Sequence, residues 1–382
     1  MKKKLAALLL GLTVAAVSVG CGKAAAENNE ETPVVSENTT GGDTVISWED
    51  LSGQQGEEEE DSVNSLDVAP EGMYMNELTG DWISEDLKNQ RPIAVMVDNE
   101  LTALNHFGTS QADIVYEMMN STANGRITRL MCIFKDYNAV SQIGSIRSIR
   151  TTNLQLMPEY DAIAIHDGGP FYINNFLANP FQDHLSSGFA RIKNGKPSEY
   201  TEYVTTGEIN DRCKAAGIDQ NYRDQWYQGQ HFQFAKHSEK VDLSKESNAK
   251  EVTFIDIPYE HNKMELTYIP ETQTYRYAEY NQEYIDELTG DHLEFTNVIL
   301  QESTFFEWDE HGYLHFNVHN GDGMHGWYIT NGYAVPITWA KGPQEFDITH
   351  FFLEDGTEIT LNIGKTYVCI IPDDSWSKLV IE

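Results

Sequence analysis

The sequence predicts a first domain of α+β or α/β class with a mixed sheet, followed by a second domain of mainly antiparallel β-structure. From residue 91, short and wholly apolar runs end in polar loops, which is typical of buried strands. Beyond residue 250, apolar and polar residues alternate between two-residue turn signals, as in half-exposed hairpins. A polar stretch without apolar period, 236–250, separates the two patterns, so we place the domains at 71–240 and 241–382.

In the first domain, strands are predicted over 93–97, 127–134 and 161–165. Residues 113–117 follow a helix-start pair and predict a turn of helix that runs into a strand. Helices are predicted at 171–178 and 206–216. For the second of these, Thr205 and Glu208 form a capping box and Gly217 suits the left-handed position beyond its end.

In the second domain, alternation over 266–277 and 313–318 predicts half-exposed strands. Turn signals at hairpin spacing support this interpretation: 288–291, Asn320-Gly321 and Asn331-Gly332.

The first 21 residues have the pattern of a bacterial lipoprotein signal. Three lysines precede an apolar run at 5–19, which is short for a membrane span, and small residues lead to Cys21. Cleavage before Cys21 and acylation of its thiol would anchor the protein by lipid to the outer face of the cell membrane. An ordinary cleaved signal peptide is the alternative, because Ser18 stands where such signals usually carry Leu.

Residues 22–70 are predicted to form a disordered acidic tether, since they are rich in Glu, Asp, Ser, Thr, Asn and Gly and include the acidic run 57–61. The whole chain carries a formal charge of −34, from 60 acidic and 26 basic residues, which argues against a nucleic-acid partner. After Cys21 only Cys132, Cys213 and Cys369 remain, without disulfide or zinc spacing. Two of these lie in apolar runs and are expected to be buried thiols, and no cofactor is predicted.

Four motifs follow one another in the first half of the chain: RPIAVMVDN (91–99), QADIVYE (111–117), GRITR (125–129) and IGSIRSIR (143–150). Together they resemble the YerB family of Gram-positive lipoproteins, whose N-terminal and C-terminal domains have unknown function. The second half is similar too, at LTG (288–290), TNVIL (296–300) and LNIGKT (361–366). The resemblance implies an envelope lipoprotein and no established reaction. This chain reads KPSEY at 196–200, where the family usually offers a histidine, so a mechanism that needs that histidine is in doubt.

A cluster of four arginines stands out because the chain as a whole is strongly acidic. Arg126, Arg129, Arg147 and Arg150 lie between residues 125 and 150, where Asp136 is the only carboxylate. Guanidinium groups offer planar, bidentate donors, so a convergent set would bind phosphate or carboxylate. The alternative is that these arginines pair with Asp98, Asp113 or Glu117 and orient the loops.

A second candidate site follows the predicted strand 161–165, at His166, Asp167 and two glycines. The carboxyl ends of strands in open α/β sheets commonly hold ligands. Adjacent residues of a strand point to opposite faces, so His166 would need a partner other than Asp167. A hydrolase or transferase acting on cell-wall glycan could use His166 as acid or base, or a carboxylate among Asp98, Glu117 and Asp167, with Asn99 beside them. His166 could also be structural.

Two further features are weaker. His311, His315, His319 and His325 cluster in sequence, but two of them on one strand face would stand roughly 13 Å apart, so no metal site is predicted. The stretch 222–227 combines Tyr222, Trp226 and Tyr227 with amide and charged side chains, which suits a glycan platform or an edge strand that closes the domain.

The leading hypothesis is a membrane-anchored binding or accessory module for anionic envelope polymer or envelope proteins, with the four arginines as contacts. The alternative is the glycan hydrolase or transferase. A third possibility is a protein-interaction surface without a small ligand.

Overall fold

The protein is described by a computed structural model that covers residues 64–123, 125–319 and 324–382. The predicted signal 1–21 with Cys21, the tether up to residue 63 and the Asn320-Gly321 turn lie outside the described residues. The last part of the predicted tether differs from expectation. Ser65–Asp67 form a 3-10 helix, and the Asp67 carboxylate accepts hydrogen bonds from the Ser238 amide and hydroxyl at 2.8 and 2.7 Å. The folded region therefore begins before residue 70.

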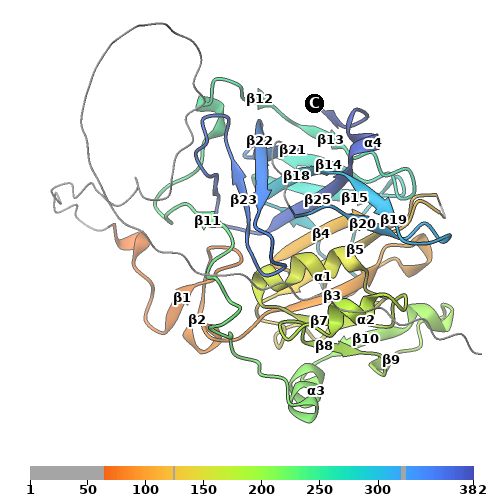
Figure 1. Ribbon diagram of the computed structural model, residues 1–382. Helices are drawn as coiled ribbons and strands as arrows, with labels where there is room; N and C mark the ends of the chain where they lie inside the picture. Colours follow the sequence, from red (N-terminus) through yellow and green to blue (C-terminus); the bar gives the residue numbers. More distant parts are fainter. Residues whose placement is uncertain (1–63, 124, 320–323) are drawn as a thin grey trace, which may run out of the picture. The chain divides into compact units, whose positions relative to one another are not determined.

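One mixed sheet of eleven strands forms the centre of the described region (Figure 1). Its order is β12-β22-β21-β18-β25-β4-β5-β3-β7-β8, with β23 beside β22. In chain order the strands are β3 Ile93–Asp98, β4 Ile114–Met119, β5 Thr128–Phe134, β7 Ile163–His166, β8 His184–Ser186, β12 Lys250–Glu251, β18 Asn297–Ser303, β21 Met324–Thr330, β22 Tyr333–Lys341, β23 Thr349–Phe352 and β25 Thr366–Pro372. The predicted strands at 93–97, 127–134 and 161–165 are confirmed.

Strands from both predicted domains meet in this sheet, because β4 pairs in parallel with β25. The pairs β3/β7, β7/β8 and β18/β25 are also parallel, whereas β3/β5, β4/β5, β18/β21 and β21/β22 are antiparallel. The domain boundary near residue 240 stays a prediction, but the sheet itself continues across it.

A second sheet of six strands is antiparallel and comes entirely from residues after 250. It contains β13 Phe254–Asp256, β14 Glu265–Ile269, β15 Thr274–Glu279, β16 Gln282–Glu283, β17 Glu294–Phe295 and β26 Val380–Ile381. The predicted segment 266–277 is thus a hairpin of two strands. The Asn331-Gly332 turn joins β21 to β22 with both residues at positive φ, as predicted.

Short strands complete the chain: β1 Met73–Met75 with β2 Trp82–Ser84, β6 Gln142–Gly144 and β9 Ala190–Arg191 on either side of β10 Glu202–Thr205, β11 Gln233–Phe234 with β24 Thr360–Leu361, and β19 Phe305–Glu307 with β20 Leu314–Phe316. The last of these lies within the segment 313–318 that was predicted as a strand.

Helices are few and short: α1 Thr151–Leu156, α2 Ile173–Leu177, α3 Glu208–Ala216 and α4 Asp373–Trp376. The predicted helix 171–178 corresponds to α2, and 206–216 corresponds to α3. Glu208 accepts the Thr205 amide at 3.1 Å, as half of the capping box, and Gly217 has φ +71°. The fold is therefore mostly strand, and the α/β part of the predicted class is not confirmed.

Both faces of the central sheet are covered. Neighbouring residues of β4 point to opposite sides. Glu117 meets Tyr277 of β15 on one side, and Met118 meets Asn153 of α1 on the other, where α1 and α2 lie near β20 (Figure 1). Strands β3, β4, β5 and β25 are consequently buried along their whole length, which explains why their sequences are mostly apolar. Cys132, Cys213 and Cys369 are buried free thiols.

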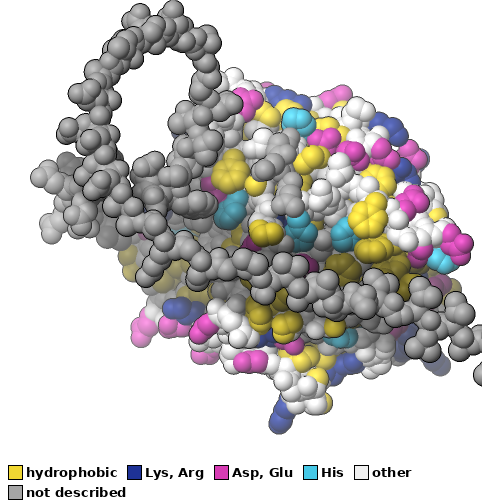
Figure 2. All heavy atoms as spheres, in the orientation of Figure 1, with side chains coloured by type: hydrophobic (Ala, Val, Ile, Leu, Met, Phe, Trp, Pro, Cys, Tyr) yellow, Lys and Arg dark blue, Asp and Glu magenta, His cyan; other side chains and the backbone are white. Residues whose placement is uncertain are grey.

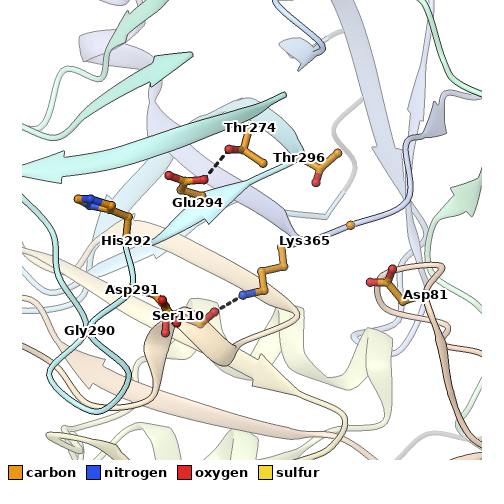
Figure 3. A pocket seen from close by; sticks show the side chains of 10 residues that line it. Asp81, Ser110, Thr274, Gly290, Asp291, His292, Glu294, Thr296 and Lys365 are labelled. Carbon is orange, nitrogen blue, oxygen red and sulfur yellow. Dashed lines mark hydrogen bonds between the residues drawn. The ribbon is translucent and has the colours of Figure 1, made fainter. Parts of the chain in front are cut away.

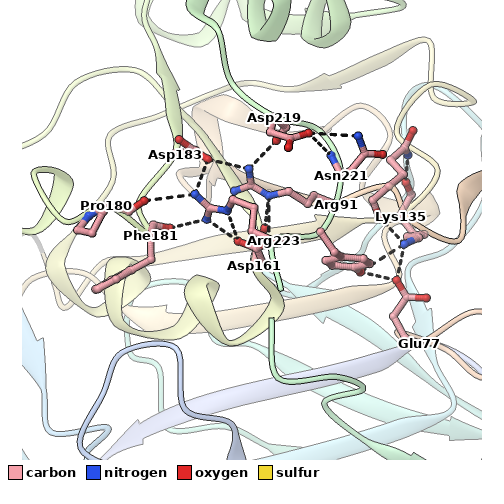
Figure 4. A network of polar contacts seen from close by, with 12 residues as sticks. Glu77, Arg91, Lys135, Asp161, Pro180, Phe181, Asp183, Asp219, Asn221 and Arg223 are labelled. Atoms are coloured by element: carbon pink, nitrogen blue, oxygen red, sulfur yellow. Dashed lines mark hydrogen bonds and ion pairs between the residues drawn. The ribbon is translucent and has the colours of Figure 1, made fainter. Parts of the chain in front are cut away.

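A buried ion network explains the arginine that opens the first family-like motif (Figure 4). The fully buried Arg91 donates to the Asp161 carbonyl at 2.7 Å, the Asp183 carboxylate at 2.7 Å and the Asp219 carbonyl at 2.6 Å. Arg223 binds the same Asp161 and Asp183 carboxylates. Arg91 and Arg223 therefore tie the start of β3 to the loops before β7, β8 and β11, and are structural.

Two buried carboxyl groups, Glu117 and Glu279, meet where the second sheet packs on the first. Four side chains donate to the Glu117 carboxylate: Asn262 at 2.8, Tyr367 at 2.8, Tyr277 at 2.9 and Asn99 at 3.1 Å. Asn262 also donates to Glu279 at 3.2 Å, and the Tyr277 hydroxyl oxygen lies 3.3 Å from the same carboxyl. Burial raises the pKa of both carboxyls, and the charge of Glu117 raises that of Glu279 further.

We expect Glu279→Gln to increase the free energy of unfolding at pH 7. The folded pKa of Glu279 lies above its unfolded value, so wild-type stability falls as pH rises between these two pKa values, by up to about 1.4 kcal/mol per pH unit. Glutamine has the same shape and does not ionise. Denaturant unfolding from pH 4 to 8 should show the advantage of the variant growing with pH and vanishing near pH 4. Exposed Glu271→Gln is the control, and an equal pH trend in both variants would contradict the argument.

Candidate anion-binding site

Two of the four predicted arginines contact one buried carboxylate, and a third lies beside them. Asp98 ends β3 and stands opposite Arg129 of β5 in the strand register, with 3.8 Å between Asp98 Oδ1 and a terminal nitrogen of Arg129. Arg147, in the loop after β6, contacts Asp98 Oδ2 through Nε. Its terminal nitrogen reaches the half-exposed Glu199 at 3.1 Å. The alternative expectation, that arginines pair with Asp98, holds for these two residues.

The third arginine, Arg150, has no carboxylate within ion-pair distance among the residues that the structure describes. It is only 8% exposed, its guanidinium stacks 4.2 Å from the Tyr313 ring centre, and it donates to the Ile149 carbonyl at 3.0 Å. The buried Nε atoms of Arg129 and Arg150 have no hydrogen-bond partner there either. Burial, reinforced by the nearby charge of Arg129, lowers the pKa of Arg150 to about 10, so it remains a cation at neutral pH.

Positive charge is therefore in excess at this point of a strongly acidic protein. Arg129 and Arg147 share the fully buried carboxylate of Asp98, Arg147 also contacts Glu199, and Arg150 adds a third charge next to Arg129. Burial lowers the pKa of Arg129 also, because a buried charge loses its hydration. An anion with several oxygen acceptors would supply both the missing charge and the missing acceptors.

Backbone hydrogen bonds hold the arginine segment against the glycine loop. The Asp167 amide donates to the Arg147 carbonyl at 3.0 Å, and the Ile149 amide donates to the Gly168 carbonyl at 3.2 Å. Gly168 has φ +73°, which favours glycine, and a Cβ at Gly169 would lie 2.2 Å from Ile173. Both glycines are exposed and Ser148 is half-buried, so small groups form the surface next to the arginines. The structure thus brings two separately predicted motifs together.

Arg126 lies apart from this group. It binds the Asp374 carboxylate of α4 through two nitrogens, at 2.7 and 3.1 Å, on a partly exposed part of the surface. The sequence could not separate Arg126 from the others, because its partner lies 248 residues further along the chain.

His166 has both ring nitrogens engaged. Nδ1 lies 2.8 Å from the Gly168 carbonyl, which can only accept, so Nδ1 carries the proton and Nε2 accepts from His184 at 3.1 Å. Burial lowers the pKa of His166 to about 4. Asp167 is paired with Arg191 at 3.4 Å. A neutral, fully bonded histidine with only 1% exposure is poorly placed for acid-base work on a polymer.

The remaining acid-base candidates are also enclosed. Asp98, Asn99 and Glu117 are completely buried, and Asn99 and Glu117 belong to the network with Glu279. Their hydrogen bonds join the two sheets, so we assign Asn99 and Glu117 to structure.

Two of the three predicted stacking residues, Tyr222 and Tyr227, line a cleft of about 590 Å³ beside β1. The Tyr222 ring stacks on Tyr227 at 3.8 Å and has the Lys135 ammonium 4.5 Å from its centre. Trp226 packs edge-on against Phe181 at 5.6 Å. Glycan contact by Tyr222, Trp226 and Tyr227 stays a prediction.

A polar cavity of about 580 Å³ lies beside Lys365, and its lining is acidic, unlike that of the arginine site (Figure 3). Asp81, Asp291 and Glu294 line it, and the Lys365 ammonium donates to the Ser110 carbonyl. Its acidic lining does not suit an anion.

Two of the histidines that cluster in the sequence have separate hydrogen-bond partners in the structure. His315 bonds the Thr151 hydroxyl at 2.9 Å, and His319 lies 3.4 Å from the Gly342 carbonyl. In the described ranges, no three His, Cys, Asp or Glu side chains are arranged to hold a metal ion.

Comparison with known proteins identifies the family of the chain. Residues 78–219 match the family described as "Protein of unknown function (DUF3048) N-terminal domain", and residues 255–368 match the corresponding C-terminal domain. The chain belongs to the DUF3048 family. Among curated proteins, this DUF3048 chain is 25% identical over 321 residues to "Putative lipoprotein YerB" of Bacillus subtilis (strain 168), covering 78% of the chain and 86% of that protein. The resemblance to the YerB family is confirmed.

A solved structure supports the fold of this DUF3048 protein. The crystal structure of YerB from Bacillus subtilis matches with a TM-score of 0.68 at 22% identity, over 81% of this chain and 99% of the other. Over the part that the structure describes, no helix is long and apolar enough to cross a membrane.

Proposed function

We propose that this protein is a lipid-anchored module at the outer face of the cell membrane that binds an anionic group of an envelope polymer. The anchor is supported by the lipoprotein-like segment before Cys21 and by the name of the YerB relative. The binding role rests on one observation above all: Arg150 is buried, cationic and without a carboxylate partner in the described residues, next to Arg129 and Arg147.

The ligand in this proposal contacts the protein through one or a few anionic groups. The net charge of −34 would repel a polyanion lying along the surface. Beyond about 8 Å this repulsion is largely screened at physiological salt, whereas direct contacts to partly buried guanidiniums are not. A phosphate or carboxylate that enters beside Gly168 would therefore be selected locally.

The hydrolase or transferase alternative gains no support from the geometry. Its histidine is neutral with both nitrogens bonded, and two of its carboxylates are buried, one in the arginine cluster and one between the sheets. An envelope protein with an exposed carboxylate remains compatible with the arginine site as a partner of the same chemistry.

Binding of the purified protein to immobilised polymers at 0.15 M salt tests the proposal. The protein should be retained by poly(glycerol phosphate) and by poly-γ-glutamate, and it should not be retained by neutral dextran. Retention of the protein by dextran alone, or by none of the three polymers, would overturn the proposal. Release of polymer fragments into the supernatant would instead restore the enzyme hypothesis.

A further inference from the structure

Exposed aromatic side chains gather next to the arginine site. Phe171, Phe306 and Trp308 are 83%, 48% and 37% exposed, and they are the only aromatic residues among the exposed large hydrophobic side chains of the described ranges. Phe171 follows the glycine loop, and the other two lie on or just after β19. Figure 2 shows hydrophobic side chains at the surface in the region of β19 and β20, with acidic side chains beside them.

Ring contacts make these residues one surface. Trp308 stacks on Tyr172 at 4.9 Å and meets the edge of Phe306 at 5.0 Å, while Phe171 meets Tyr172 at 5.4 Å. The Trp308 indole nitrogen donates to the Thr151 hydroxyl at 3.0 Å, directly after Arg150 in the chain. The aromatic surface and the arginines are therefore fixed to the same point of α1.

A cleft of about 480 Å³ opens beside Phe171. Pro170, Phe171, Asp309, Glu310, His311 and Tyr313 line it. Tyr313 has Arg150 4.2 Å from its ring centre, so the same ring that borders the cleft contacts the buried cation. Asp309 and Glu310 would repel an anionic group inside the cleft, but carboxylates are good acceptors for hydroxyl groups.

We infer that this cleft and its aromatic rim bind a sugar ring, so that the ligand is an anionic polysaccharide rather than a ringless polyanion. Aromatic faces accept the C–H face of a pyranose, and carboxylate and imidazole groups around them bind its hydroxyls. The anionic substituent would lie on the arginine side, beside Gly168. This inference rests on the proposed function and adds the chemical class of the polymer backbone.

The test compares two polycarboxylates that differ in the ring. Polygalacturonate carries its carboxylates on pyranose rings, and poly-γ-glutamate has none. Wild-type protein should bind polygalacturonate roughly tenfold more tightly, and Phe171→Ala should remove that advantage while leaving poly-γ-glutamate binding unchanged. Because Phe171 is 83% exposed, its loss should not affect folding. Met73→Ala, an exposed apolar residue on β1, is the matched control and should change neither affinity.

The outcomes separate the inference from the proposed function. Equal binding of both polymers, insensitive to Phe171→Ala but weakened by Arg150→Gln, would overturn the sugar site and leave the arginine site standing. If Phe171→Ala weakens binding and Arg150→Gln leaves it unchanged, the anionic part of the proposal would be overturned. If Phe171→Ala instead abolishes binding to phosphatidylglycerol vesicles and leaves polygalacturonate binding intact, the aromatic surface is a lipid contact and the inference is wrong.

Discussion

Replacing Lys341 by methionine is expected to lower the free energy of unfolding by about 3–5 kcal/mol, because it leaves a buried carboxylate without its cation. Lys341 and Glu159 are both fully buried, with 2.6 Å between the ammonium and a carboxylate oxygen. Burial alone would raise the pKa of Glu159, but Lys341 and His231 outweigh it and lower that pKa to about 2. Glu159 therefore stays charged at every ordinary pH in the wild-type protein, whereas in Lys341→Met the burial of this carboxylate is no longer offset by the lysine.

This pair also joins distant parts of the chain. Lys341 ends β22 and additionally donates to the Gln155 carbonyl at 2.9 Å, while Glu159 accepts the Thr349 amide at 2.8 Å. Denaturant unfolding at pH 7 measures the loss. Lys378→Met, which breaks an exposed 3.1 Å pair with Glu260, should cost at most about 1 kcal/mol. The double variant Glu159→Gln/Lys341→Met should recover part of the loss. If Lys341→Met and Lys378→Met were equally mild, the buried pair would not have the role we assign to it.

Replacing Arg150 by glutamine is expected to weaken binding of poly(glycerol phosphate) by roughly 10- to 150-fold, the range expected for losing a charge-assisted hydrogen bond of about 1.5–3 kcal/mol. Arg150→Lys, which keeps the charge but not the planar fork, should lie between wild type and Arg150→Gln. Arg126→Gln is the matched control. Arg126 pairs with Asp374 away from the cluster and should change affinity less than twofold.

Stability of the same variants distinguishes binding from structure. An arginine with a structural role stabilises the ligand-free protein, so replacing it lowers the free energy of unfolding. Arg150 instead holds a buried charge beside Arg129 with no carboxylate partner in the described ranges, so Arg150→Gln should leave the unfolding free energy of the ligand-free protein unchanged or raise it. Loss of several kcal/mol without loss of binding would identify Arg150 as structural and remove the main support for the site.

The sequence predicted the fold best where a segment is buried on both faces. The runs 93–97 and 130–134 have no polar interruption because both strands are buried along their whole length. Helix α1 was not predicted, since its Thr-Thr-Asn start has no apolar period and Asn153 bonds back to the Arg150 amide at 2.9 Å. The parallel pairing of β4 with β25 joins residues 252 positions apart at Ile114 and Thr366, and no local pattern encodes such a contact.

The candidate site was predicted in part for the same reason. Charge sign alone indicated Arg129, Arg147 and Arg150, but the separation of Arg126 depends on α4 at the far end of the chain. The covered ring of Tyr222 depends on Lys135, 87 residues away. The aromatic surface at Phe306 and Trp308 did have a local signal, the run Phe305-Phe306-Glu307-Trp308. Its closeness to the arginines depends on contacts between distant residues, such as the bond between Trp308 and Thr151.

The arginine side chains themselves give the most direct test. In an NMR titration of the purified protein with poly(glycerol phosphate), the Nε–H signals of Arg129 and Arg150, which have no partner in the described structure, should shift together with that of Arg147. The Arg126 signal should stay in place. Shifts of equal size at all four arginines, or none at Arg129 and Arg150, would contradict an anion site built around Asp98.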